Sequence, residues 1–390
     1  MKVMERMRPP AVGPFREDAF ASPARSERTA AILGIALGVS FLTCFATGLY
    51  SHLAQHPPSW FHLSARPAGL YRFTQGIHVA TGLASIPLLI AKLWTVFPKL
   101  FAWPPFHGVA SVLERISLLP LVGGSLFLLF TGLANINLWY PWPFNFPIAH
   151  YWVAWITIGA LVVHIGAKVS TTREALRRTS MSPDEPLAVD PAGMSRRQLL
   201  ATAFGVSGLV TLVTVGQTYA PLRKLALLAP RRPDTGPQGF PVNRTARAAG
   251  VVTTARAASY RLEVTGRIPT PLSLDLDHIR SMPQHSATLP IACVEGWSVT
   301  KTWEGVRVRD LLALAGVHSA RPVRIESLQQ HRSYRSSDMD ADQVGDADTL
   351  LALRVDGEEL ALDHGYPLRL IAPNRPGVMQ TKWVARVVVL

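Results

Sequence analysis

Five apolar blocks, each about 20 residues long, constrain the fold of this chain more than any other feature. They run over residues 30–50, 73–97, 109–134, 150–169 and 199–219 of the 390 residues. A helix of this length can cross a hydrocarbon core of about 30 Å. A backbone in lipid must satisfy its own polar groups, which favours helices. The sequence therefore predicts a membrane bundle of about five transmembrane helices.

The basic residues are concentrated in the apolar half of the chain. Residues 1–230 hold 19 Lys and Arg against 9 Asp and Glu, whereas residues 231–390 hold 20 against 17. Nucleic-acid binding would need basic residues clustered on a folded surface. Here they lie between apolar blocks, so membrane lipid is the predicted partner and nucleic acid is not. No oligomeric state is predicted.

Loops rich in Lys and Arg are expected on the cytoplasmic side of a membrane. These charges fall in residues 1–29, near 98–108 and in 171–198, whereas the loops 51–72 and 135–149 hold only Arg66 and Arg72. This predicts a multi-pass plasma-membrane protein with a cytoplasmic N-terminal segment, residues 1–29, and an extracytoplasmic domain after the fifth helix. The first 29 residues lack an apolar core, so no N-terminal signal peptide is predicted.

Histidines inside the apolar blocks need a reason, because ionisable residues are costly in a bilayer. His150 and His164 are 14 residues apart, which places them within about 40° of one helix face and about 21 Å apart along it. His78 has a depth similar to that of His150, so the two could ligate one iron. His107 is the candidate partner of His164. Alternatively, these are interfacial histidines bonded to local polar groups.

This histidine pattern, over about residues 30–170, resembles the b-type cytochrome subunits of formate dehydrogenases and the cytochrome b561-like families. The resemblance implies haem b ligated by His78, His150, His164 and His107. The first helix carries no histidine, which leaves the number of haems open at one or two. Cys44 on that helix is interpreted as a small packing residue.

The next segment, residues 171–220, combines a cytoplasmic loop with the fifth helix. Residues 195–200 read Ser-Arg-Arg-Gln-Leu-Leu before an apolar stretch, which resembles a twin-arginine export signal. The alternative is that Arg196 and Arg197 are ordinary cytoplasmic charges before a helix. Residues 221–255, rich in Pro, Arg and Ala, are predicted to be a linker.

Residues 256–390 change to short strands and turns. The run 260–266 alternates at period two, 286–293 and 383–390 are further strand candidates, and 308–316 is a short helix ending in Gly. This predicts an α+β domain with the chain end in a sheet.

Several motifs occur in order in this domain. Cys293 is followed by Val-Glu-Gly-Trp, then by Trp-Glu-Gly at 303–305, and later by His364-Gly-Tyr-Pro-Leu-Arg369 and Lys382-Trp. Together they resemble the molybdenum-binding stretch of sulfite oxidase-type proteins. The resemblance implies one molybdopterin, with Cys293 as a molybdenum ligand. A soft thiolate suits such a metal. The alternative is a buried core cysteine. A disulfide with Cys44 is not predicted, because the two lie in segments of different character.

The same resemblance implies four contacts to the cofactor. His364 would present a polar side chain, Arg369 would bind the phosphate with its guanidinium fork, Lys382 would be a second basic contact, and Ser327 occupies the position of a small hydroxyl residue. Alternatively, Arg369 and Lys382 are surface charges beside strands.

The substrate is predicted from the residues on the C-terminal side of Cys293. No arginine occurs there before Arg307, unlike in sulfite-oxidising members, and the pattern is closer to bacterial subunits that reduce methionine sulfoxide. Arg332 and Arg335 come from a separate loop. Tyr334 between them is interpreted as a residue of the substrate pocket, or as a plain loop tyrosine.

These features together predict a membrane-bound molybdoenzyme. It would exchange electrons between a quinone or quinol pool, haem b and a molybdopterin centre, and would reduce a small S- or N-oxide. The alternatives are sulfite oxidation that feeds electrons to the membrane, and a membrane electron carrier without catalytic activity.

Overall fold

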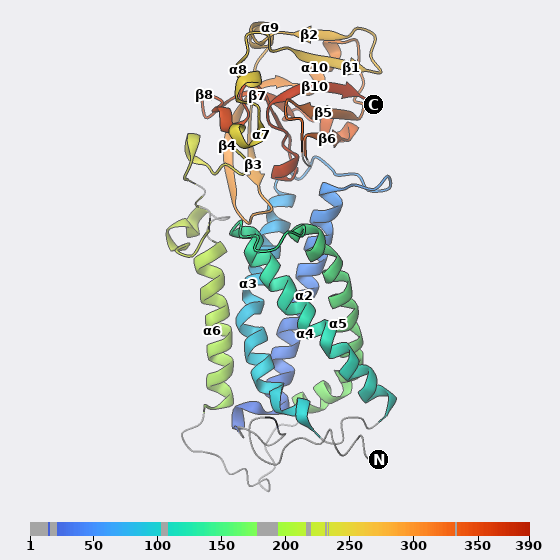
Figure 1. Ribbon diagram of the computed structural model, residues 1–390, viewed down its shortest axis with the longest axis vertical. Coiled ribbons are helices and arrows are strands. Elements are labelled where there is room, and N and C mark those ends of the chain that lie inside the picture. Colours follow the sequence, from blue (N-terminus) through green and yellow to red (C-terminus); the bar gives the residue numbers. More distant parts are fainter. Residues whose placement is uncertain are drawn as a thin grey trace. The chain divides into compact units, whose positions relative to one another are not determined.

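The computed structural model describes residues 15, 22–102, 108–177, 194–215, 220–230, 232, 234–331 and 334–390 (Figure 1). The chain divides into two compact units. The first comprises Met1–Ala46 and Ile77–Val213, and the second comprises Thr47–Gly76 and Thr214–Leu390. Each unit therefore combines segments that are not consecutive in the sequence.

The chain has five long helices: α2 (Glu27–Gln55), α3 (Leu70–Val96), α4 (Val109–Ile136), α5 (Phe146–Arg177) and α6 (Arg196–Val215). They dominate the first unit, and the second unit takes the end of α2 from Thr47 and the start of α3 up to Gly76. By length and composition, all five could cross a membrane. Only 17–33% of the residues in their apolar stretches are buried. Large apolar side chains therefore cover their outer faces, as in Leu119, which is 80% exposed. This confirms the predicted five apolar helices. Short 3₁₀ turns lie at Pro23–Arg25 (η1) and Phe97–Phe101 (η2).

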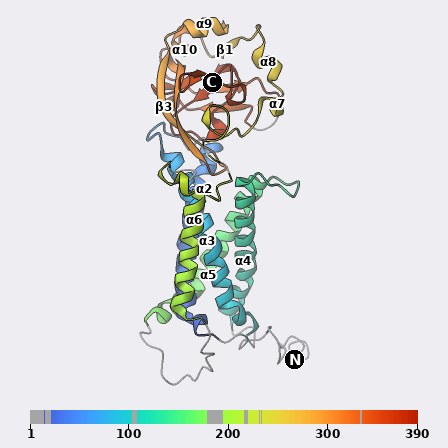
Figure 2. The same cartoon turned by 90° about the vertical axis from the view of Figure 1, so that its left-hand side faces the viewer.

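The helices of the first unit run alongside one another (Figure 2). Leu33 of α2, Leu88 of α3 and Ala203 of α6 belong to one buried apolar cluster. At Gly124 of α4, a Cβ atom would come within 2.2 Å of Thr157 Oγ1 on α5. The close approach of these two helices therefore requires glycine, as is common for helices that pack in membranes.

Two sheets form the framework of the second unit. The first has the order β2-β1-β10-β5-β6, with β1 (Leu262–Gly266) parallel to β10 (Val384–Val389) and the other pairs antiparallel. The remaining strands of this sheet are β2 (Leu272–Leu274), β5 (Val323–Ser327) and β6 (Ser336–Met339). The predicted α+β domain, with the chain end in a sheet, is confirmed.

The second sheet is antiparallel and has the order β3-β4-β7-β8, with β9 paired to β7. Its strands are β3 (His285–Ala292), β4 (Ser298–Arg307), β7 (Leu350–Val355), β8 (Glu358–Glu359) and β9 (Arg369–Ile371). The short helices among the strands are α9 (Leu276–Ser281), α10 (Val308–Leu314) and α11 (Ala341–Gly345), with turns η5 (Leu362–His364) and η6 (Gly377–Met379).

The period-two pattern explains the strands around the main core. Leu262 and Val264 of β1 are fully buried and pack with Val387 of β10 and Ile325 of β5. The side chains of a strand alternate between its two faces. One face of this sheet therefore becomes the core.

Part of the predicted linker, residues 221–255, is folded against two other buried clusters of the second unit. After η3 (Ala220–Leu225), the segment forms η4 (Pro237–Gly239), α7 (Ala246–Ala249) and α8 (Val252–Arg256). Phe240 is 1% exposed and packs edge-on against Trp303, and Val251 packs with Trp383. From Pro237 onward the segment therefore contributes to the buried core of the second unit, because its apolar side chains bury tryptophan surface.

The segment Thr47–Gly76 is attached to the rest of the second unit by polar contacts. Arg66 donates to both carboxylate oxygens of Asp346 at 2.9 Å and to Asp348 at 2.6 Å. Asn374, which is 2% exposed, accepts from Tyr71 N at 2.8 Å and donates to Ser64 O at 2.8 Å. Both contacts join residues about 300 positions apart.

Candidate active site

Cys293 lies at the tip of the hairpin formed by β3 and β4. Its N–H donates to Trp297 O at 2.9 Å, and Gly296 N donates to Cys293 O at 3.1 Å. Gly296 has φ 81°, a conformation that glycine adopts without steric cost. The tight loop turns Cys293 inward, where it is 2% exposed. The two cysteines of the chain, Cys44 and Cys293, are not joined by a disulfide.

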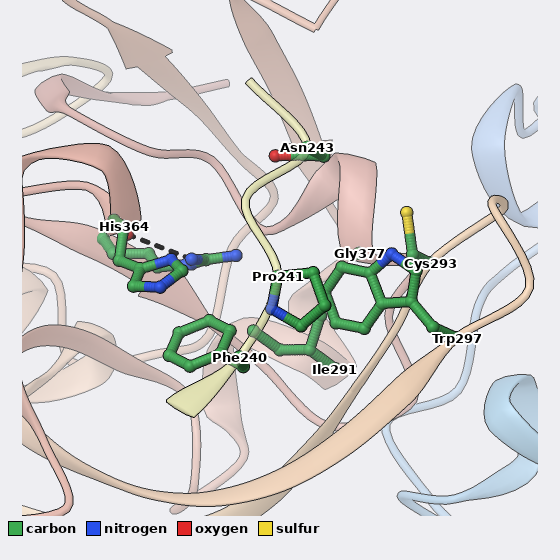
Figure 3. Close-up of a pocket in the computed structure, with 9 residues that line it drawn as sticks. Phe240, Pro241, Asn243, Ile291, Cys293, Trp297, His364 and Gly377 are labelled. Atoms are coloured by element: carbon green, nitrogen blue, oxygen red, sulfur yellow. Dashed lines mark hydrogen bonds between the residues drawn. The ribbon is translucent and has the colours of Figure 1, made fainter. Parts of the chain in front are cut away.

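A pocket brings Cys293 together with two other predicted site residues, His364 and Arg369 (Figure 3). Phe240 and Pro241 lie between the cysteine side and the histidine side of this pocket. The complete described lining is Phe240, Pro241, Asn243, Ile291, Cys293, Trp297, His364, Arg369 and Gly377. The wall formed by Phe240, Pro241 and Asn243 was not predicted from the sequence, because the composition of this stretch is typical of a linker.

Arg369 is a buried cation. It lies on β9 and is 5% exposed, so it is not a surface charge. It donates to His364 O at 3.0 Å and lies 5.4 Å from the centroid of the Trp303 ring. Its Nε has no hydrogen-bond partner among the described residues. Burial lowers its pKa to about 9, against the opposing effect of Cys293. A buried guanidinium with an unsatisfied donor is suited to an anionic ligand.

Lys382 places a second positive charge next to Arg369. The two residues form an isolated antiparallel bridge. A Cβ atom on Gly365 would lie 3.1 Å from Arg369 Cβ and 3.3 Å from Lys382 Cβ, so glycine allows the two side chains to come together. Lys382 Nζ donates to the carbonyl oxygens of Arg244 and Asp363. Burial, and then the charge of Arg369, hold its pKa well below the ordinary value.

His364 is neutral at physiological pH. It is 1% exposed, its Nε2 lies 2.7 Å from Pro237 O, and its ring stacks on Phe240 with 3.6 Å between centroids. Burial, followed by the charge of Arg369, lowers its pKa to about 3. Ser327 is not in the described pocket lining. Its hydroxyl donates to Lys382 O at 2.8 Å, so it holds the backbone that carries a basic residue.

Tyr334 also lies outside the described lining of this pocket. Its hydroxyl donates to Gln55 Oε1 at 3.1 Å. Burial and then the charge of Cys293 raise its pKa. Ala54, next to Gln55 in the sequence, and Ala292, next to Cys293, belong to one buried cluster with Tyr71. Arg335 is exposed and donates to Gln330 O at 3.4 Å. Arg332 lies outside the described residues.

In the first unit, two predicted haem ligands face each other. The rings of His78 on α3 and His150 on α5 have centroids 6.2 Å apart. Nδ1 of His78 lies 2.9 Å from Cys44 O, and Nδ1 of His150 lies 2.9 Å from Thr131 Oγ1. Such bonds orient the ring of a metal-ligating histidine.

The other two predicted ligands are not brought together in the described structure. His164 lies on α5, and its buried Nδ1 has no hydrogen-bond partner among the described residues. His107 lies outside the described residues.

Comparisons with known proteins give matches for the second unit. Residues 249–390 match the family described as the oxidoreductase molybdopterin binding domain. Sulfite oxidase of Arabidopsis thaliana is 29% identical over 159 residues, which cover 32% of this chain and 40% of that protein. The putative protein-methionine-sulfoxide reductase subunit YedZ1 of Azospira oryzae is 33% identical over 129 residues, which cover 33% of this chain and 48% of that protein. This chain thus spans less than half of either relative.

These matches define the class of the second unit. Residues 249–390 form a molybdopterin-binding oxidoreductase domain, and the two relatives match this part of the chain. The predicted resemblance to sulfite oxidase-type proteins is confirmed for this domain. The resemblance of the helical half to b-type cytochromes stays a prediction.

Proposed function

We propose that this protein is a membrane-bound molybdoenzyme that exchanges electrons between a quinone pool, haem b and a molybdopterin centre, and that it reduces an S- or N-oxide. The observation that carries the proposal is the pocket in which Cys293, His364 and Arg369 meet. Residues from β9 and from the tip of the β3–β4 hairpin converge there, as the sulfite oxidase-type motifs imply.

The residues of the pocket fit the cofactor. The Cys293 thiolate would be the protein ligand of molybdenum, because soft sulfur suits the metal. Arg369 and Lys382 would bind the phosphate, and the unsatisfied Nε of Arg369 is a donor that this anion would use. Neutral His364 would contribute a hydrogen bond without adding charge. When bound, the cofactor supplies oxygen-atom transfer and the accompanying two-electron change.

The geometry of His78 and His150 supports one haem b. The two rings come within 6.2 Å of each other, centre to centre, and each Nδ1 is hydrogen-bonded. Together the two imidazoles would hold the iron, and the haem would supply one-electron transfer. A second haem would use His164, with His107 as its predicted partner. A quinone is the proposed membrane partner of this haem.

Local charge favours a neutral oxide as the substrate. The loop after Cys293 carries Glu295, which is 8% exposed and accepts from Trp297 Nε1 at 3.1 Å. A carboxylate there, in place of arginine, disfavours a doubly charged anion. Reduction of a sulfoxide consumes two electrons and two protons and yields a sulfide and water. The similarity to sulfite oxidases favours sulfite oxidation as the second candidate.

The test uses membranes that contain the full-length protein. We expect bound molybdenum, and we expect reduced haem to be reoxidised when methionine sulfoxide or trimethylamine N-oxide is added. The Cys293→Ser variant is the control and should show no reoxidation. Sulfite that reduces the haem faster than either oxide reoxidises it would support the second candidate. Protein without molybdenum that acts on no substrate would contradict both.

The proposed location is the plasma membrane, with a cytoplasmic N-terminus and an extracytoplasmic oxidoreductase domain. Arg196 and Arg197 begin α6 and are exposed, as an export signal requires. Replacing both with Lys should leave residues 231–390 protected from protease added to spheroplasts. Unchanged cleavage would show that ordinary membrane insertion suffices.

A further inference from the structure

Tyr334 is held by two glutamines in an uncommon backbone conformation. Its φ is 64°, a region that is costly for a bulky side chain. Its carbonyl oxygen accepts from Gln329 Nε2 at 3.0 Å, and its hydroxyl donates to Gln55 Oε1 at 3.1 Å. Backbone strain of this kind persists where surrounding contacts enforce it, and it concentrates at functional sites.

Gln55, the last residue of α2, belongs to the same unit as Tyr334. Its Nε2 donates to Ser51 O at 3.1 Å and to Ser51 Oγ at 3.1 Å. A carbonyl oxygen can only accept, so the NH₂ group must face Ser51 and Oε1 must face Tyr334. The Tyr334 hydroxyl can therefore only donate to Gln55.

Ser51 connects Gln55 to two more side chains. Its hydroxyl donates to Gln75 Oε1 at 3.2 Å and lies 3.0 Å from the Tyr71 hydroxyl. Ser51 has one hydrogen, which goes to Gln75, so Tyr71 is the donor in the other bond. The exposed fractions of Ser51, Tyr71 and Gln75 are 8%, 1% and 6%. A satisfied, buried polar network of this kind rigidifies its members, and here it fixes the Gln55 amide.

We propose that Gln55 is a positioning residue of the candidate active site, which directs the hydrogen of the Tyr334 hydroxyl toward its own Oε1. The network is joined to the loop of Cys293 because Tyr71 packs with Ala54 and Ala292. The phenol oxygen then presents a lone pair, which suits a neutral ligand or a product water better than an oxyanion. This catalytic consequence rests on the proposed function. The hydrogen-bond geometry does not.

The first test measures the pKa of Tyr334 directly and does not require catalytic turnover. Full-length protein carries 3-fluorotyrosine at position 334, and its fluorine signal is titrated with pH. Gln55 accepts a bond from the neutral phenol, so Gln55→Ala should lower the pKa of this tyrosine by roughly one unit. Gln55→Glu places a negative charge at the same point and should raise it. A merely structural role of Gln55 would not shift the pKa of Tyr334 in opposite directions in these two variants.

Gln330→Ala is the matched control, because Gln330 is exposed in the same loop and its side chain bonds only to Leu328 O in the described structure. It should leave the titration unchanged. If Gln55→Ala, Gln55→Glu and the wild type all titrate alike, the proposal is overturned, whether or not the protein reduces an oxide. If the titrations shift as expected but no oxide is reduced, the proposed function fails and the positioning role stands.

The second test is a double-mutant cycle on oxide reduction. Gln55→Ala should lower kcat about tenfold and leave KM within about threefold. In a Tyr334→Phe background, Gln55→Ala should have no further effect, because the hydroxyl that it positions is gone. Equal losses in the two backgrounds would show that Gln55 does not act through Tyr334.

Discussion

The two units hold their candidate metal ligands in different ways. In the first unit, His78 and His150 lie on two long helices, and hydrogen bonds to Cys44 O and Thr131 Oγ1 orient their rings. In the second unit, Cys293 lies in a hairpin loop and shares a pocket with Arg369 of β9, which pairs with Lys382 from the segment before β10. A site on helices therefore depends on helical periodicity. A site in the mixed unit depends on contacts between segments far apart in the sequence.

This comparison predicts that the two sites can be damaged separately. Cys293→Ser should reduce oxide turnover by more than about 1000-fold, or at least ~4 kcal/mol in transition-state stabilisation, because the molybdenum ligand is lost. The haem absorption spectrum should be unchanged, since both of its proposed protein ligands are in the other unit. Turnover at the wild-type rate, measured with dye-linked electron donors, would refute the ligand assignment.

Substitutions in the first unit should show the reverse pattern. His78→Ala and His150→Ala should each remove the same low-spin haem signal while molybdenum content stays constant, because the two imidazoles are proposed to share one iron. His164→Ala should spare that signal. Redox difference spectra and metal analysis of each variant provide the measurement. Loss of two different signals would break the pairing.

Burial of His364 beside Arg369 should make the stability of the second unit depend on pH. The pKa of His364 is about 3 in the folded protein, below about 6.5 in an unfolded chain. Its contribution is therefore present above pH 6.5 and is lost as pH falls towards 3. Cofactor-free protein should lose about 3 kcal/mol of unfolding free energy between pH 7 and pH 4.5 through this group. Chemical denaturation in detergent at several pH values should show a shallower loss in His364→Gln. Identical slopes would exclude His364 as the cause.

The smallest expected effect concerns the attachment of the segment Thr47–Gly76. Asn374→Ala removes the partners of Tyr71 N and Ser64 O, which should cost about 2 kcal/mol and lower the midpoint of thermal unfolding by roughly 4–8 °C. Asn374 has φ 50°, so Asn374→Gly separates lost hydrogen bonds from backbone strain. Arg324→Ala removes only an exposed ion pair with Asp338, and should cost under about 1 kcal/mol. Calorimetry should show a larger loss of stability for Asn374→Ala than for Arg324→Ala. A larger loss for Arg324→Ala would be inconsistent with a structural role for this attachment.

The sequence was informative wherever the pattern is local. Apolar blocks of membrane-spanning length predicted the five helices, and period-two alternation predicted the strand that begins at Leu262. The convergence of Cys293, His364 and Arg369 came from motif resemblance, and the pocket contains all three.

The sequence was uninformative where contacts are distant. Arg66 and Arg72 were interpreted only as loop charges, yet Arg66 binds Asp346, 280 residues later, and Arg72 donates to Thr300. Phe240 lies in a stretch whose composition is typical of a linker, and its burial depends on Trp303 and His364. Neither the distant ion pairs nor the burial of Phe240 leaves a periodic pattern in the sequence. Only the folded chain reveals them.

The discontinuous second unit has a consequence for biosynthesis. Arg66 and Asn374 are separated by most of the chain, and at about 5–20 residues per second the ribosome needs roughly 15–60 s to make the residues between them. The segment Thr47–Gly76 therefore lacks its final contacts during synthesis of the rest of α3, of α4 to α6 and of nearly the whole oxidoreductase domain. Contacts this distant in sequence form late in folding. The segment can thus dock only after the oxidoreductase domain has been synthesised. A substitution that weakens its docking contacts should reduce the yield of assembled protein.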